Sequence, residues 1–132
     1  MHRLLSRILL VPLSLLAATA YASSPAAIHT FACNSSLSSC PQGASPETLI
    51  QGSDGNFYGA TQVSSQNTSQ PNGGTIFSIT PAGKFTLLHT FLPGSNSSYP
   101  EGSVPAVLVE GPDGHLYGTT FYGGTGFGVA FA

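Results

Sequence analysis

The stretch LIQGSDGNFYGAT at positions 49–61 occurs a second time, as LVEGPDGHLYGTT at positions 108–120. The two copies lie 59 residues apart (111 − 52, between their first glycines), and seven of the thirteen positions are identical. A period of this size is typical of propellers and solenoids, in which each repeat forms one supersecondary unit. The identical pairs are Leu49/Leu108, Gly52/Gly111, Asp54/Asp113, Gly55/Gly114, Tyr58/Tyr117, Gly59/Gly118 and Thr61/Thr120.

Each copy is predicted to form a tight β-hairpin around Gly-Ser-Asp-Gly or Gly-Pro-Asp-Gly. Pro112 fixes its own φ at about −65°, which suits the first central position of a type I turn. Gly114 would then close a G1 bulge in the left-handed conformation. The alternative is a type I′ turn whose two central residues are Asp113 and Gly114. In either turn Asp54 and Asp113 can accept backbone N–H bonds, so a structural role is expected for them and for Gly55 and Gly114.

The first 22 residues have the features of a secretory signal peptide. Arg3 and Arg7 precede an apolar run at 8–17, and Ala20-Tyr21-Ala22 is a cleavage signal of the A-x-A type. We therefore expect an N-terminal signal helix, cleavage after Ala22 and a secreted or cell-surface protein. Retention as an uncleaved anchor is the alternative, although the apolar run is short for a bilayer. No membrane span is expected after cleavage.

Few charges remain after residue 22. Lys84 is then the one basic side chain besides histidines, against five acidic residues. A nucleic-acid-binding protein needs a basic surface, so this class of partner is excluded. The many Gly, Pro, Ser, Thr and Asn residues between short β-branched and aromatic patches indicate an extracellular all-β protein.

The two cysteines, Cys33 and Cys40, are predicted to form a disulfide. A close pair in an exported chain most often does so. A C-x-x-C redox motif has different spacing, and a zinc site needs more ligands than the neighbouring sequence supplies.

The alternating patches predict one complete unit of four strands, at 48–51, 56–61, 74–80 and 84–91. His29-Thr30-Phe31 recurs as His89-Thr90-Phe91, so it is read as the last strand of a preceding repeat. Four antiparallel strands in this length match a propeller blade. The predicted organisation is a signal peptide at 1–22, the end of a preceding repeat with the disulfide loop at 23–47, a complete repeat at 48–91, and a loop with a truncated second repeat at 92–132.

The pattern of residues 49–61, 73–83, 87–91, 108–120 and 128–131 with Gly123-Gly124 resembles the GloVer tandem repeat of exported bacterial proteins. The resemblance implies a secreted or surface-attached, propeller-like protein of unsettled activity. The chain departs from that family at Gln62–Asn72, which replaces a glycine-rich connector, and in holding fewer than two complete repeats.

The expected fold is therefore all-β, with antiparallel four-stranded units of β-propeller-blade type in an incomplete ring. Propellers close with about four to eight blades. Further repeats, or self-association of the chain, would complete the ring. A fragment of a longer gene is the other interpretation of the missing repeats.

Catalytic chemistry is not indicated by the remaining candidates. Asp54 and Asp113 occupy the same place in separate repeats, which favours the turn over a shared metal or catalytic site. His29 and His89 also repeat, which favours packing over a hydrolytic triad, and no G-x-S-x-G motif is present. We expect no catalytic, metal-binding or cofactor-binding residues and no cofactor.

Two aromatic residues, Phe121 and Tyr122, are candidates for ligand stacking, because they are expected to open a loop rather than to lie in a strand. The first functional hypothesis is a non-enzymatic binding or surface-scaffold module with an unknown extracellular ligand. The alternative is a fragment of a propeller enzyme that acts on glycans or lactones.

Overall fold

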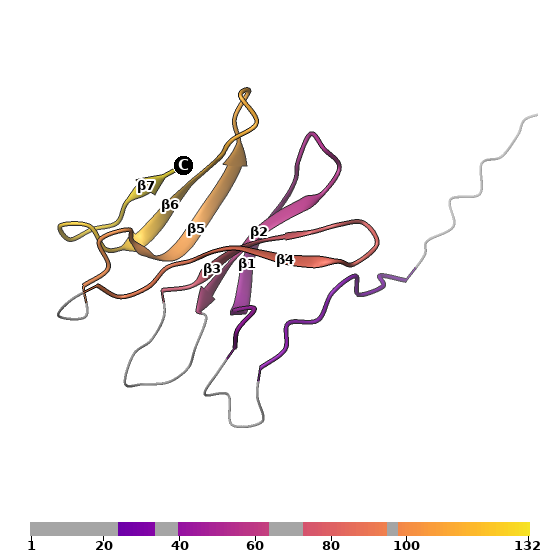
Figure 1. Ribbon diagram of the computed structural model, residues 1–132, viewed down its shortest axis with the longest axis horizontal. Coiled ribbons are helices and arrows are strands. Elements are labelled where there is room, and N and C mark those ends of the chain that lie inside the picture. Colours follow the sequence, from indigo (N-terminus) through magenta and orange to yellow (C-terminus); the bar gives the residue numbers. More distant parts are fainter. Residues whose placement is uncertain (1–23, 34–39, 64–72, 95–97) are drawn as a thin grey trace, which may run out of the picture.

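The computed structural model describes residues 24–33, 40–63, 73–94 and 98–132, whose regular structure is entirely β-strand. Their strands form two antiparallel sheets that lie side by side (Figure 1). The first sheet has the order β1-β2-β3-β4 and the second β5-β6-β7. The strands are β1 Ala44–Gln51, β2 Phe57–Val63, β3 Thr75–Ile79, β4 Phe85–Thr90, β5 Ser103–Glu110, β6 Leu116–Tyr122 and β7 Ala130–Phe131. The expected all-β, antiparallel fold is confirmed; the signal peptide and signal helix predicted at 1–22 lie outside the described residues.

The outer ends of the hairpins are longer than predicted. β1 and β5 begin before their prolines, because a β-bulge between Pro46 and Thr48, or between Pro105 and Val107, lets pairing continue past a residue that lacks an N–H. Ser45 and Val104 precede those prolines with positive φ values of 55° and 58°. The backbone therefore turns in the same way at the same place in both sheets.

The strand partners of β1 and β5 lengthen with them. β2 continues to Val63, opposite Ala44, and β6 continues to Tyr122, opposite Ser103. The prediction that Phe121 and Tyr122 open a loop is therefore wrong: both belong to β6.

The turns of both hairpins follow the first predicted geometry. Gly114 N–H donates to the Gly111 carbonyl at 3.0 Å, and Gly55 does the same to Gly52. Gly114 has a φ of 79°, whereas Asp113 is not among the residues with positive φ, which the type I′ turn would require.

The predicted strand at His29-Thr30-Phe31 is absent, because residues 24–33 pair with no strand in the structure. The segment instead packs through its rings. His29 stacks on Phe85 at 4.7 Å between centroids, and Phe31 meets Phe77 edge-on at 5.0 Å. A strand needs a neighbouring backbone edge, and this segment lies against the side-chain face of the first sheet.

The core lies between the two sheets. Leu108 of β5 is 2% exposed and packs with Ala60, Ile76 and Phe91 of the first sheet and its end. Leu49, the counterpart of Leu108 in the first sheet, is 53% exposed. The same sequence position is therefore buried where a neighbouring sheet covers it and exposed where none does.

Candidate functional site

Hairpin tips carry the two repeated aspartates. Asp54 accepts hydrogen bonds from the backbone N–H of Asn56 at 3.0 Å and from the Tyr58 hydroxyl at 2.8 Å. Asp113 accepts from the N–H of His115 at 3.1 Å and from the hydroxyl of Tyr117 at 2.6 Å. The tyrosines extend the predicted backbone contacts, and sequence reasoning did not find them, although Asp and Tyr recur four positions apart.

These contacts change the acidity of the groups. The Tyr58 hydroxyl, followed by the Asn56 N–H, holds the pKa of Asp54 below its ordinary value of 3.8. The Tyr117 hydroxyl and the His115 N–H lower the pKa of Asp113 in the same way. The aspartates in turn raise the pKa of both tyrosines. A carboxylate held in its ionised form by the turn is poorly suited to act as a general acid.

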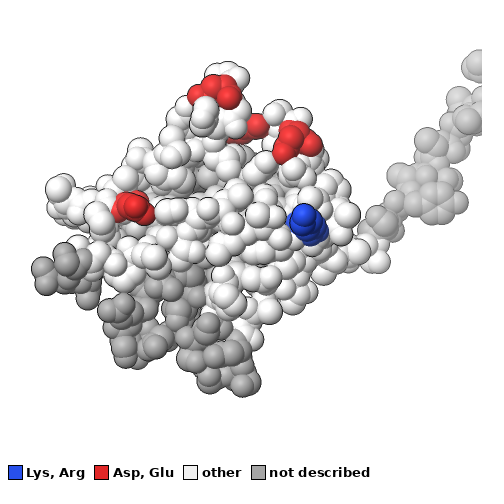
Figure 2. All heavy atoms as spheres, in the orientation of Figure 1, with Lys and Arg blue, Asp and Glu red and all other residues white. Residues whose placement is uncertain are grey.

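The two tips are linked to each other. Ser53 of the first turn donates its N–H and its hydroxyl to the Glu110 carboxylate at 2.7 and 2.8 Å. Figure 2 shows acidic side chains gathered over these tips. The tertiary structure thus makes Glu110, at the end of β5, a link between the two sheets.

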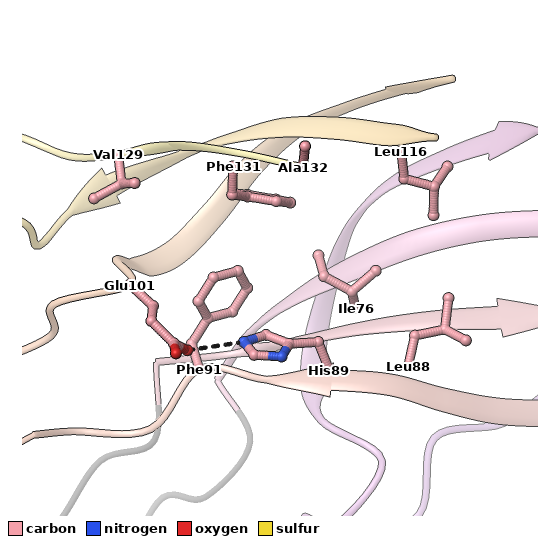
Figure 3. Close-up of a pocket in the computed structure, with 9 residues that line it drawn as sticks. All are labelled: Ile76, Leu88, His89, Phe91, Glu101, Leu116, Val129, Phe131 and Ala132. Carbon is pink, nitrogen blue, oxygen red and sulfur yellow. Dashed lines mark ion pairs between the residues drawn. The ribbon is translucent and has the colours of Figure 1, made fainter. Parts of the chain in front are cut away.

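A groove of about 480 Å³ opens beside the core, between the end of β4 and the face of β7 (Figure 3). Its lining is mainly apolar, with one polar pair: His89 Nε2 lies 3.2 Å from Glu101 Oε2. The residues that line it are Ile76, Leu88, His89, Phe91, Glu101, Leu116, Val129, Phe131 and Ala132.

The histidine contact has a counterpart in the other half of the chain. His29 Nε2 lies 3.3 Å from Gln42 Oε1, and Gln42 precedes Glu101 by the repeat spacing. Gln42 places a neutral amide where Glu101 places a carboxylate. A histidine contact that forms with either group can hold a loop in place and does not depend on a charged partner. This argues against His89 and Glu101 as an acid–base pair.

The aromatic candidates Phe121 and Tyr122 lie at the end of β6 and are 56% and 63% exposed. Their ring centroids are 6.4 Å apart, with the planes tilted by 43°. Phe127, in the following turn, is fully exposed. Sequence reasoning named the first two residues and did not consider the third.

Cys33 and Cys40 lie at disulfide distance, with 2.06 Å between their sulfurs, as predicted. Cys40 is fully buried. A disulfide is compatible with an extracellular location. Within the described ranges, no three His, Cys, Asp or Glu side chains gather closely enough to hold a metal ion. Those ranges also contain no helix with the length and apolar character needed to cross a bilayer.

Comparisons with protein-family models, with curated proteins and with solved structures find no match to this chain.

Proposed function

We propose that the chain is an exported, non-enzymatic binding module built of propeller-like blades, which binds a neutral extracellular polymer such as a polysaccharide. The observation that carries the proposal is the exposed aromatic pair Phe121 and Tyr122. Aromatic rings that face solvent bury a large area when a flat, partly apolar surface such as a sugar ring stacks on them.

The pair is not required by the hairpin itself. The first sheet has Gln62 and Val63 at the corresponding places, and its hairpin has the same register. Aromatic residues at a position that the fold does not fix, and at the solvent-exposed end of a strand, favour binding over packing.

The blade assignment is part of the proposal. Each sheet has an antiparallel meander order, and the second sheet packs on the first through Leu108 as neighbouring blades do. The resemblance to the GloVer repeat and the signal-peptide sequence support the same interpretation. The proposed placement is secreted or cell-surface.

Affinity electrophoresis in native gels that contain neutral polysaccharides tests this function. We expect the exported chain to be retarded by at least one polymer. The double variant Phe121→Ala/Tyr122→Ala should migrate as in a gel without polymer, whereas Lys84→Ala, an exposed change at the β3–β4 turn, should be retarded like the parent. Equal retardation of parent and double variant, or none for the parent across a broad polymer panel, would contradict the proposal.

A further inference from the structure

We infer that copies of this chain associate head to tail, with residues 26–31 of one copy added as the fourth strand of the second sheet of the next copy. The inference rests on the blade assignment in the proposed function. It specifies the partner, a second copy of this chain, and the register of the contact.

The first argument is that the N-terminal segment contacts the first sheet in the way that the chain at the end of β4 contacts the second sheet. Phe31 meets Phe77 at 5.0 Å and 69°, and Phe91 meets Phe131 at 5.3 Å and 65°. Phe77 and Phe131 are counterparts, since each ring lies over the repeated glycine of its hairpin, Gly59 or Gly118. Phe31 therefore contacts the first sheet as Phe91 contacts the second.

The neighbouring histidines agree. His29 meets Phe31 edge-on at 5.1 Å and 89°, and His89 meets Phe91 at 4.8 Å and 83°. The contacts of these histidines with Gln42 and Glu101 match as well, as described above. Three contacts thus give the segment the arrangement of a strand end, although no strand in the described chain pairs with it.

The second argument is a strand edge that is unpaired among the described residues. In the first sheet β3 is followed by β4, with His89 opposite Ile76 and Thr90 opposite Thr75. In the second sheet β7 is the last strand of its order in the described chain, and the apolar groove lies beside it. A strand from another chain can add to such an edge through backbone hydrogen bonds.

The register follows from the first sheet. Shifting the β3–β4 pairs by the repeat spacings places Thr30 of one copy opposite Val129 of the other, and His29 opposite Ala130.

The third argument is that the open faces of the two sheets are complementary. Val107 and Val109 on the far face of the second sheet are 53% and 52% exposed. Val109 is the counterpart of Ile50, which packs against the core between the sheets. Leu49, on the open face of the first sheet, is the counterpart of the buried Leu108. Stacking one copy on the next would bury these residues as their counterparts are buried within the chain.

This arrangement is heterologous, so it closes into a ring if the rotation between copies permits. With the two described sheets in each copy, the four to eight blades of known propellers correspond to about two to four copies. One contact does not recur: Pro112 and Gln51 replace Ser53 and Glu110, so the link between the hairpin tips is absent between copies. The association between copies should therefore be weak enough for the oligomer to dissociate on dilution.

The test uses the full chain, exported and purified, with its mass measured by light scattering over a range of concentrations. We expect a mass of two to four copies that falls on dilution. Thr30→Pro, which places a proline in the added strand, and Leu49→Ala should each raise the dissociation constant by about tenfold or more. Lys84→Ala should leave it unchanged. A folded monomer at every concentration, or a chain with no cooperative unfolding, overturns the inference.

Cross-linking checks the register and the polarity. Thr30→Cys and Val129→Cys are made as separate variants and treated with a short bis-maleimide. Their mixture should give a cross-linked pair, and each variant alone should not. Cross-linking of either variant with itself would place the same residue of two copies side by side, which contradicts the head-to-tail contact. Polysaccharide binding is measured on the same samples after dilution to the monomer, because Phe121 lies on the same face of the second sheet as Val107 and Val109, which stacking would cover. A chain that binds but stays monomeric at every concentration contradicts the assembly alone. A chain that forms oligomers but whose diluted monomer does not bind contradicts the proposed function alone.

Discussion

Tyr58 and Tyr117 add a side-chain contact to turns that a backbone hydrogen bond already closes. Each hydroxyl reaches the aspartate four residues before it, and that aspartate also accepts the N–H two residues after it. The turn is thereby closed by a side-chain network as well as by its backbone bond. The repeated Asp and Tyr of the sequence are the residues that form this network.

The double variant Tyr58→Phe/Tyr117→Phe removes both hydroxyls and keeps the rings. The folded-state pKa of each aspartate lies below 3.8, so each stabilises the fold above that pH and loses the contribution as the pH falls through the lowered value. We expect a lower urea midpoint than the parent at pH 7 and a smaller difference at strongly acidic pH. Tyr122→Phe is the control, and equal differences at both pH values would contradict the assignment.

Gly59 allows the ring of Phe77 to lie on the strand. A Cβ added there would come within 2.4 Å of the ring and 2.6 Å of the Thr48 carbonyl oxygen. Gly59→Ala should therefore destabilise the fold by about 1–3 kcal/mol, as overpacking does. Urea unfolding measures this loss of stability. Gly126→Ala, where a Cβ would meet nothing within 4 Å, is the control; equal effects of both changes would argue against the contact.

At the scale of the elements, each hairpin has the same bulge, turn and pairing register, and the two sheets differ in what covers them. A sheet with apolar residues on both faces needs a neighbour on each side. Among the described residues, β5 has such a neighbour on one face: the first sheet lies against the side that carries Leu108. The stability contributed by an apolar side chain therefore depends on which sheet carries it.

Leu108→Ala and Leu49→Ala form a matched pair at equivalent positions. Loss of the buried Leu108 should reduce the free energy of unfolding by about 2–5 kcal/mol. Loss of the exposed Leu49, measured at a dilution where the chain is monomeric, should change it by about 0.5 kcal/mol or less. Chemical unfolding followed by circular dichroism gives both values. Similar losses would mean that both positions are buried alike and that the chain packs differently.

At the scale of the whole molecule, the N-terminal segment is held to the first sheet by ring contacts and by the Cys33–Cys40 bond. The disulfide closes a short loop between the end of that segment and the approach to β1. It restricts the unfolded chain and keeps His29 and Phe31 close to the sheet that they cover.

Reduction of the disulfide should lower the free energy of unfolding by about 2.5 kcal/mol, from the chain-entropy value for a loop of this length. Urea unfolding with and without a phosphine reductant measures the change. The double variant Cys33→Ala/Cys40→Ala controls for the reagent, because its stability should not respond to it. An unchanged midpoint in the parent would show that the bond does not restrict the unfolded chain.

The sequence was sufficient to predict the strands and turns, because these depend on neighbours a few residues away. Alternating apolar residues, the Asp-Gly turns and the repeated stretch led to the all-β fold, both hairpins and the cysteine pair. The strands were predicted to begin only after the prolines, at position 48 in the first repeat, so the bulges that carry β1 and β5 past Pro46 and Pro105 were missed. The exposed pair Phe121–Tyr122 was named, but its place in β6 depended on that longer ladder.

What the sequence by itself determined is the repeated unit: its hairpin, its turn residues and the strand pairs within it. Only the tertiary structure decided which copy of each repeated position is buried, as with Leu108 and Leu49, and where His29 and Phe31 lie. The physical reason is that strand and turn preferences are local properties of the chain, whereas the burial of a face depends on a neighbouring sheet that is distant in sequence. Identical residues in two repeats therefore have different environments.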